Sequence, residues 1–276
     1  MTLSDRNVFF KVGIVLSALC TLGVLAASFE ILPAYSLIEE NARRPTAFFQ
    51  VFVSRFLFVN YYAVHASLAM AVLFSLVTII LIHYFFEKTQ VSELLYIAFF
   101  AVSLSFEAVR IIIPLHIIYD IPSLYLLIAS RILLFSRYFG LFSLFTASVC
   151  AAGFNEEKAR NTIMIIAAAA LIITMGVPVD TQTWDTSLSM INGYASMFRL
   201  IEAVLLITTV ISFLIAINVR GSKEYGFIGL GALLALAGRN ILLSADNWAS
   251  PAFGILLLSV GTWFICSKLH KIHLWL

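Results

Sequence analysis

The chain has 276 residues, of which 62% are hydrophobic and only 12% are charged, and its formal net charge at pH 7 is +2. This composition excludes an ordinary water-soluble domain, in which about a quarter of the residues are charged. The small net charge and the lack of a Lys/Arg-rich run exclude a nucleic-acid-binding protein. We therefore expect an all-α, polytopic integral membrane protein that forms one transmembrane domain over residues 1–276.

Eight segments are long and apolar enough to cross a hydrocarbon core, which takes about 20 residues per helix. The first segment also has the charged start and small-residue end of a cleavable signal peptide, but we expect it to be retained as a helix. The connection after it, 30–55, is expected to lie along the outer membrane surface as an interfacial segment. In chain order the predicted spans are 9–29, 56–86, 94–119, 123–153, 161–178, 194–218, 225–245 and 251–269.

The lysines indicate the orientation of these spans. All six lysines fall at the N-terminus, in alternate loops or at the C-terminus. Because positive residues favour the cytoplasmic side, an eight-helix chain with both termini in the cytoplasm accounts for all of them. We expect this orientation in a plasma membrane, of the bacterial inner-membrane type.

Ionisable side chains in five of the spans fall at a similar depth, in the half nearer the outer side. Such groups are costly in a membrane unless they face the protein interior or a wet cavity, and they usually mark function. Arginine stays charged and binds phosphate or carboxylate through two parallel hydrogen bonds, so its excess here favours an anionic ligand. The expected ligand-binding residues are His65, Glu107, Arg110, Arg131, Arg199, Glu202, Arg239 and Asn240.

Within this set, Arg131 and Arg239 are expected to hold the anion, assisted by Arg110 and Arg199. Glu107 is expected to pair either with Arg110, three residues further along the same helix, or with Arg131 on the next helix. Arg137, which lies nearer the middle of its span, adds to the surplus of positive charge. The same charges could instead form ion pairs that only hold helices together, or reach lipid phosphates at the surface.

The favoured function is therefore the binding of an anionic ligand, such as a lipid head group, in an outward-facing cavity for transport or flipping. The alternative is a membrane-embedded sensor or a structural subunit of a membrane complex, with a protein partner or a second copy of the chain. An intramembrane enzyme is the third reading, although no complete catalytic set is visible. The "EENARR" at 39–44 matches the EExxxR pattern of intramembrane CAAX-type proteases, but we place it in the interfacial segment. No metal or cofactor is expected, because the histidines lie at different depths.

Overall fold

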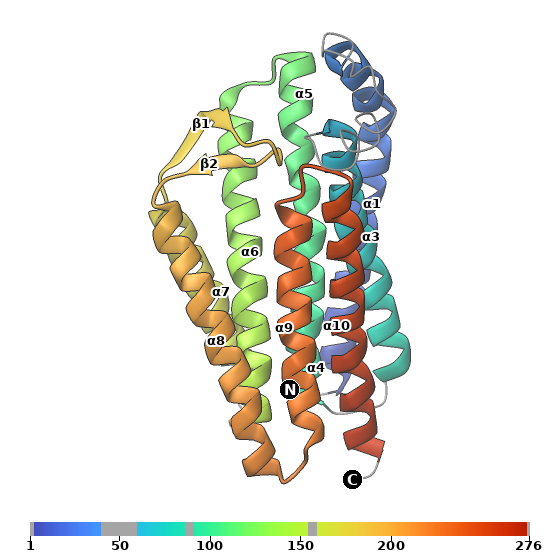
Figure 1. Ribbon diagram of the computed structural model, residues 1–276, viewed down its shortest axis with the longest axis vertical. Coiled ribbons are helices and arrows are strands. Elements are labelled where there is room, and N and C mark those ends of the chain that lie inside the picture. The colour runs from blue at the N-terminus through green and yellow to red at the C-terminus, as the bar shows by residue number, and fades with distance from the viewer. Residues whose placement is uncertain (1–2, 40–59, 87–90, 154–158, 275–276) are drawn as a thin grey trace, which may run out of the picture.

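The computed structural model describes residues 3–39, 60–86, 91–153 and 159–274, and the structural statements below concern these residues. This part of the chain contains eight helices that are long and apolar enough to cross a membrane, the number expected from the sequence. The helices stand side by side along the long axis of the molecule, and a two-stranded hairpin covers one end (Figure 1). We call this the hairpin end. The first residues of the first helix and the last residues of the last helix both lie towards the opposite end (Figure 1).

Most helix boundaries fall close to the predicted spans, and the largest difference is at the first helix. There, residues 30–39 continue the helix through Pro33 instead of starting an interfacial segment, and the remainder of that expected segment, 40–55, lies outside the described residues. The elements are α1 (Leu3–Glu39), α3 (Tyr61–Phe86), α4 (Ser92–Ser103), the 3-10 helix η1 (Leu104–Ile111), α5 (Ile112–Tyr119), α6 (Ser123–Ala151), α7 (Ala159–Gly176), β1 (Val179–Trp184), β2 (Met190–Asn192), α8 (Ala195–Arg220), α9 (Glu224–Leu243) and α10 (Ala249–Leu274).

The closest helix contact joins α9 to α10 and depends on glycine. A Cβ atom added at Gly261 would lie 2.5 Å from the backbone nitrogen of Ala235 and 2.6 Å from the backbone oxygen of Gly231. One added at Gly238 would lie 2.4 Å from the backbone nitrogen of Leu258. Small residues at this spacing allow two helix backbones to touch, which is a common way of packing helices in apolar surroundings. The contact therefore fixes α9 against α10.

The third span is not a continuous α-helix, because η1 separates α4 from α5. A 3-10 helix has 3.0 residues per turn, so side chains three apart are aligned on one face. Leu104, Glu107 and Arg110 have this spacing, and all three are buried. The 3-10 geometry thus directs the glutamate and the arginine into the interior together.

The connection between α7 and α8, which none of the predicted spans covers, contains two short antiparallel strands. Val179 pairs with Asn192, and Trp184 pairs with Met190. The turn between the strands is closed by a hydrogen bond from the backbone nitrogen of Asp185 to the backbone oxygen of Ser189, 2.8 Å long. Main-chain and side-chain groups of this turn contact the charged residues of η1 and α6.

Candidate functional site

The buried carboxylate of Glu107 binds two arginines. Its Oε1 and Oε2 atoms accept hydrogen bonds of 2.8 and 2.9 Å from Nε and Nη2 of Arg137 on α6. Its Oε2 also accepts a bond of 3.3 Å from Nη1 of Arg110. The predicted pair with Arg110 is therefore confirmed, whereas the partner on the neighbouring helix is Arg137 instead of Arg131. The Glu107 side chain is only 1% exposed, so the two guanidinium groups supply the hydrogen bonds that water would otherwise provide.

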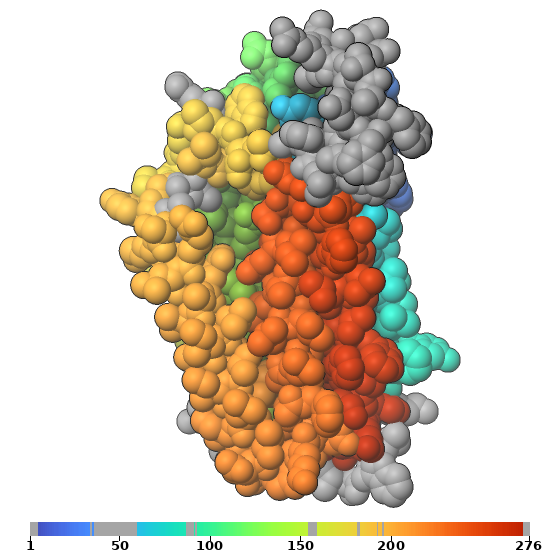
Figure 2. Space-filling view, viewed as in Figure 1, coloured from blue at the N-terminus to red at the C-terminus, as the bar shows by residue number. Residues whose placement is uncertain are grey.

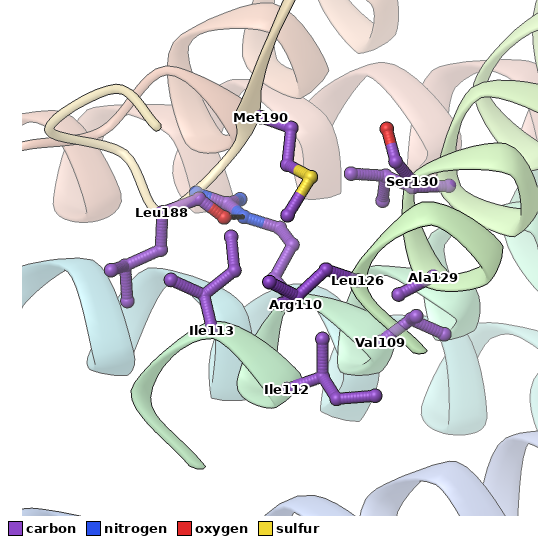
Figure 3. A pocket seen from close by; sticks show the side chains of 10 residues that line it. Val109, Arg110, Ile112, Ile113, Leu126, Ala129, Ser130, Leu188 and Met190 are labelled. Carbon is purple, nitrogen blue, oxygen red and sulfur yellow. Dashed lines mark hydrogen bonds between the residues drawn. The ribbon is translucent and has the colours of Figure 1, made fainter. Parts of the chain in front are cut away.

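Arg110 lies on the closed side of this carboxylate. Its Nε donates a hydrogen bond of 3.3 Å to the backbone oxygen of Leu188 in the hairpin turn. Figure 3 shows the Arg110 side chain directed towards Leu188, with Met190 beside it. The adjoining hollow, lined mainly by apolar side chains, has a volume of only about 10 Å³, which is about that of one water-sized probe. Arg110 is therefore a supporting residue, because no ligand larger than water fits next to it.

Arg137 lies on the open side, where a cavity of about 400 Å³ adjoins it. A volume of this order is typical of small-molecule sites. The Arg137 side chain is 20% exposed, whereas that of Glu107 is 1% exposed, and its Nη2 is also within 3.4 Å of the Ser189 hydroxyl. The cavity is lined by residues from α6, the hairpin and α8, namely Leu134, Arg137, Tyr138, Asp185, Ser189, Met190, Ile191, Phe198, Arg199 and Glu202.

Arg239 brings α9 into the same cluster. Its Nη2 donates a hydrogen bond of 3.0 Å to the backbone oxygen of Arg137, and its Nε has no hydrogen-bond partner among the described residues. The residue is 1% exposed. The Glu202 carboxylate on α8 interacts electrostatically with both Arg239 and Arg137. The cluster therefore joins four separate elements, η1, α6, α8 and α9.

The cluster carries more positive than negative charge. Among the residues that the structure describes, it contains four arginines (Arg110, Arg137, Arg199 and Arg239) and three carboxylates (Glu107, Asp185 and Glu202), which gives these side chains a net charge of +1. Asp185 belongs to the cluster because it lines the cavity and acts electrostatically on Arg110. Arginine cannot give up its proton in a protein. A net positive charge on groups that stay ionised favours an anionic ligand.

Three residues of the predicted site belong neither to the cavity lining nor to the charged cluster. Arg131 donates hydrogen bonds through Nη1 to the backbone oxygens of Thr174 and Val177, the latter at 2.7 Å. The carbonyl groups in the last turn of a helix lack partners within it, so Arg131 closes the end of α7. His65 is hydrogen-bonded through Nε2 to the Ser28 hydroxyl at 2.7 Å, between α3 and α1.

Asn240, the third of these residues, is exposed on the surface of α9. Its Oδ1 lies 3.5 Å from Nη1 of Arg239, so it contacts the cluster from outside. Of the predicted residues, Arg199 and Glu202 line the cavity itself, and Glu107, Arg110 and Arg239 lie behind it.

Sequence reasoning counted Arg137 among the buried charges but did not place it in the site, and it missed the hairpin entirely. A usable signal for Arg137 was present in the chain. Glu107 lies 14 residues before Ile121, and Arg137 lies 16 residues after it, so antiparallel helices bring the two to one level. Arg131, only 10 residues after Ile121, lies nearer the turn. For Asp185 and Ser189, the polar sequence gave no comparable signal.

No group of three or more histidine, cysteine, aspartate or glutamate side chains with metal-binding geometry occurs in the part of the chain that the structure describes. Comparison of the chain with protein-family models, with curated proteins and with solved structures found no match.

Proposed function

We propose that this protein is an integral membrane protein that binds an anionic group in the cavity between α6, α8 and the hairpin, for transport or flipping across the membrane. The observation that carries the proposal is the cavity of about 400 Å³ next to a partly buried cluster whose described side chains have a net charge of +1. Arg137 and Arg199 line this cavity and are the ligand-contacting arginines. Arg239 and Arg110 support them from behind.

Several features support a bilayer as the surroundings. The eight candidate spans have mean hydropathies between 1.5 and 2.6. Large apolar side chains on the outside of the bundle are exposed, for example Leu200 at 64% and Ile172 at 69%. Exposed apolar surface of this extent is unfavourable in water and favourable against lipid tails. Charged groups at the depth of Glu107 and Arg137 then face the protein interior, as intramembrane charges do.

The proposed orientation places the hairpin end outside the cell and both termini in the cytoplasm, as the lysine distribution favours. It can be tested by labelling with a membrane-impermeant maleimide in a variant without the three native cysteines. A cysteine at Thr183 in β1 should react from outside, and one at Ser222 between α8 and α9 should react only after the membrane is permeabilised. The reverse pattern would show that the cavity opens to the cytoplasm.

Anion binding itself is tested at Arg199, because this side chain lines the cavity on an exposed part of α8 and its removal leaves the pair between Glu107 and Arg137 in place. The probe is a phosphodiester monoanion in two forms, phosphatidylglycerol and its soluble deacylated form, glycerophosphoglycerol. Binding is measured by native mass spectrometry of the full chain. Arg199→Ala should weaken retention of the probe by about tenfold, since a hydrogen bond to a charged group contributes about 1.5–3 kcal/mol.

Two further variants make the result specific. Arg199→Lys keeps the charge but loses the planar guanidinium, so its affinity should fall between that of the parent and that of Arg199→Ala. Arg160→Ala removes an exposed arginine at the start of α7, outside the cavity lining, and should bind like the parent. Equal retention of probe by the parent and Arg199→Ala would mean that the cluster only forms ion pairs that hold helices together and that it is not an anion site.

A sensor or a subunit of a membrane complex is the second candidate, and one observation favours it. The hairpin turn contacts both arginines that bind Glu107, through the backbone oxygen of Leu188 and the hydroxyl of Ser189. A ligand that displaces Arg137 would therefore also displace the surface of the hairpin. Ligand-dependent protease protection of the hairpin, without movement of ligand across the membrane, would favour this function over transport.

A further inference from the structure

The geometry points to a lateral route into the site: we infer that the ligand is a membrane phospholipid with a singly negative head group, which enters from the bilayer between α8 and α9. This inference rests on the proposed function, because it uses the same cavity. It adds the class of ligand and the route by which the ligand arrives.

The first observation is that α8 and α9 touch at one end and separate at the other. They pack closely far from the hairpin, where a Cβ at Gly229 would be 3.0 Å from Phe213 and one at Gly226 would be 3.2 Å from Ile217. Towards the hairpin end the two helices diverge (Figure 1). Figure 2 shows a hollow between α8 in light orange and α9 in deeper orange, with green α6 visible in its floor.

The exposure of side chains along α9 agrees with this hollow. Gly226, Gly229, Leu233 and Asn240 are spaced by three, four and seven residues, so they share one helix face. The first two contact α8, yet Leu233 is 38% exposed and Asn240 is also exposed. The face of α9 that packs against α8 near Gly229 is therefore uncovered nearer the hairpin end.

On α8, the corresponding face leads to the cavity. Glu202 precedes Phe213 by eleven residues, about three helical turns, and so lies on the same side of α8. It lines the cavity and acts electrostatically on Arg239 of α9 and Arg137 of α6. The hollow between α8 and α9 thus leads from the bundle surface to the charged cluster.

The edge of the cavity suits an amphiphile better than a water-soluble anion. Ile191 and Phe198 line it together with the charged residues, and Ile191 is 50% exposed. Such apolar side chains can pack against acyl chains while the head group reaches Arg137 and Arg199. The net charge of +1 on the cluster matches one phosphodiester group with no compensating ammonium.

The test obstructs the hollow without changing the charged residues. The full chain is placed in nanodiscs of phosphatidylcholine that contain a minority of phosphatidylglycerol, and the lipids retained are identified by native mass spectrometry. Leu233→Trp places a larger side chain on the α8-facing side of α9. The matched control is Leu256→Trp on α10, where the parent side chain is 58% exposed to the surroundings of the bundle. Binding of soluble glycerophosphoglycerol is measured for each variant in parallel.

The parent should retain phosphatidylglycerol in preference to phosphatidylcholine. Leu233→Trp should lower that retention by about tenfold, the change that corresponds to a steric cost of about 1.4 kcal/mol. The same variant should bind glycerophosphoglycerol about as well as the parent, because a soluble anion does not enter between α8 and α9. A difference of up to about twofold is within the effect of an ordinary surface substitution. Leu256→Trp should match the parent with both probes.

Other outcomes overturn the inference in distinguishable ways. If the parent binds glycerophosphoglycerol but shows no preference for phosphatidylglycerol, the ligand is a soluble anion and the lipid assignment is wrong. Equal lipid retention by Leu233→Trp and Leu256→Trp would exclude entry between α8 and α9. Each of these results leaves anion binding intact, whereas failure of Arg199→Ala to weaken binding of either probe removes the proposed function itself.

Discussion

Replacement of Glu107 by alanine should destabilise this protein more than replacement of any of the arginines around it. The carboxylate accepts hydrogen bonds from Arg137 at 2.8 and 2.9 Å and from Arg110 at 3.3 Å, and its side chain is 1% exposed. Its loss leaves two guanidinium groups in the interior without their counter-charge. Removing one partner of a buried ion pair costs about 3–5 kcal/mol, and the shared partner places Glu107 at the upper end of this range.

The consequence is measurable as a change in thermal unfolding of the purified chain, followed by tryptophan fluorescence. At about 2 °C per kcal/mol for a chain of this size, a cost at the upper end of that range should lower the Tm of Glu107→Ala by about 10 °C. Arg137→Gln should lower it less, because Glu107 then keeps its bond to Arg110.

A double-mutant cycle isolates the interaction. Glu107→Gln and Arg137→Gln together should cost less than the sum of the two single changes, with a coupling of about 0.5–3 kcal/mol. Two results would refute the reasoning. One is a Glu107→Ala variant within about 0.5 kcal/mol of the parent, which is typical of an ordinary surface substitution. The other is additive behaviour of the two glutamine variants, which would mean that the two side chains do not stabilise each other.

Three further predictions concern helix packing, each with its own control or contrary result. Gly261→Ala should destabilise the chain by about 1–3 kcal/mol because its Cβ would overlap the α9 backbone, whereas Gly23→Ala in α1, with no atom within 4 Å of its Cβ, should be neutral or stabilising in the same unfolding assay. Gly140→Ala should lower the Tm because its Cβ would lie 2.2 Å from Oγ of Ser103. Ser103→Gly in the same chain should restore much of the lost stability. If it does not, the clash is not with Ser103. Arg131→Ala should lower the Tm, because the backbone oxygens at the end of α7 lose their hydrogen bonds, but should leave retention of phosphatidylglycerol unchanged. A loss of lipid binding would mean that Arg131 belongs to the ligand site.

Hydropathy was sufficient to predict the helices of this fold, because each span is a long apolar run bounded by polar or helix-breaking residues. The polar elements between and within the spans could not be predicted in the same way. The sequence of η1, LSFEAVRI, has the composition of an ordinary helix, so nothing in it indicates the tighter winding. The hairpin has few apolar residues, and its pairing depends on contacts with the bundle that a local pattern does not contain.

The site was predicted in part, since charged residues at one depth do gather around Glu107. The partner expected on the neighbouring helix, Arg131, was wrong because it lies nearer the turn between the two helices than Glu107 does. From Glu107 to Ile121 the chain rises about 24 Å when the 3-10 residues are given their longer rise, and from Ile121 to Arg137 it also rises about 24 Å. Arg131 is closer to the turn by six residues, or about 9 Å. Counting outwards from the turn would have identified Arg137.

The sharing of Glu107 by two arginines also restricts how this protein can change during evolution. A lineage that lost the carboxylate first would retain Arg110 and Arg137 in the interior with no counter-charge, and selection for a folded protein would remove it. A lineage that first replaced Arg137 would still have Arg110 to balance Glu107. Natural variation should therefore begin at the arginines, and sequences that lack Glu107 should already lack at least one of its two partners.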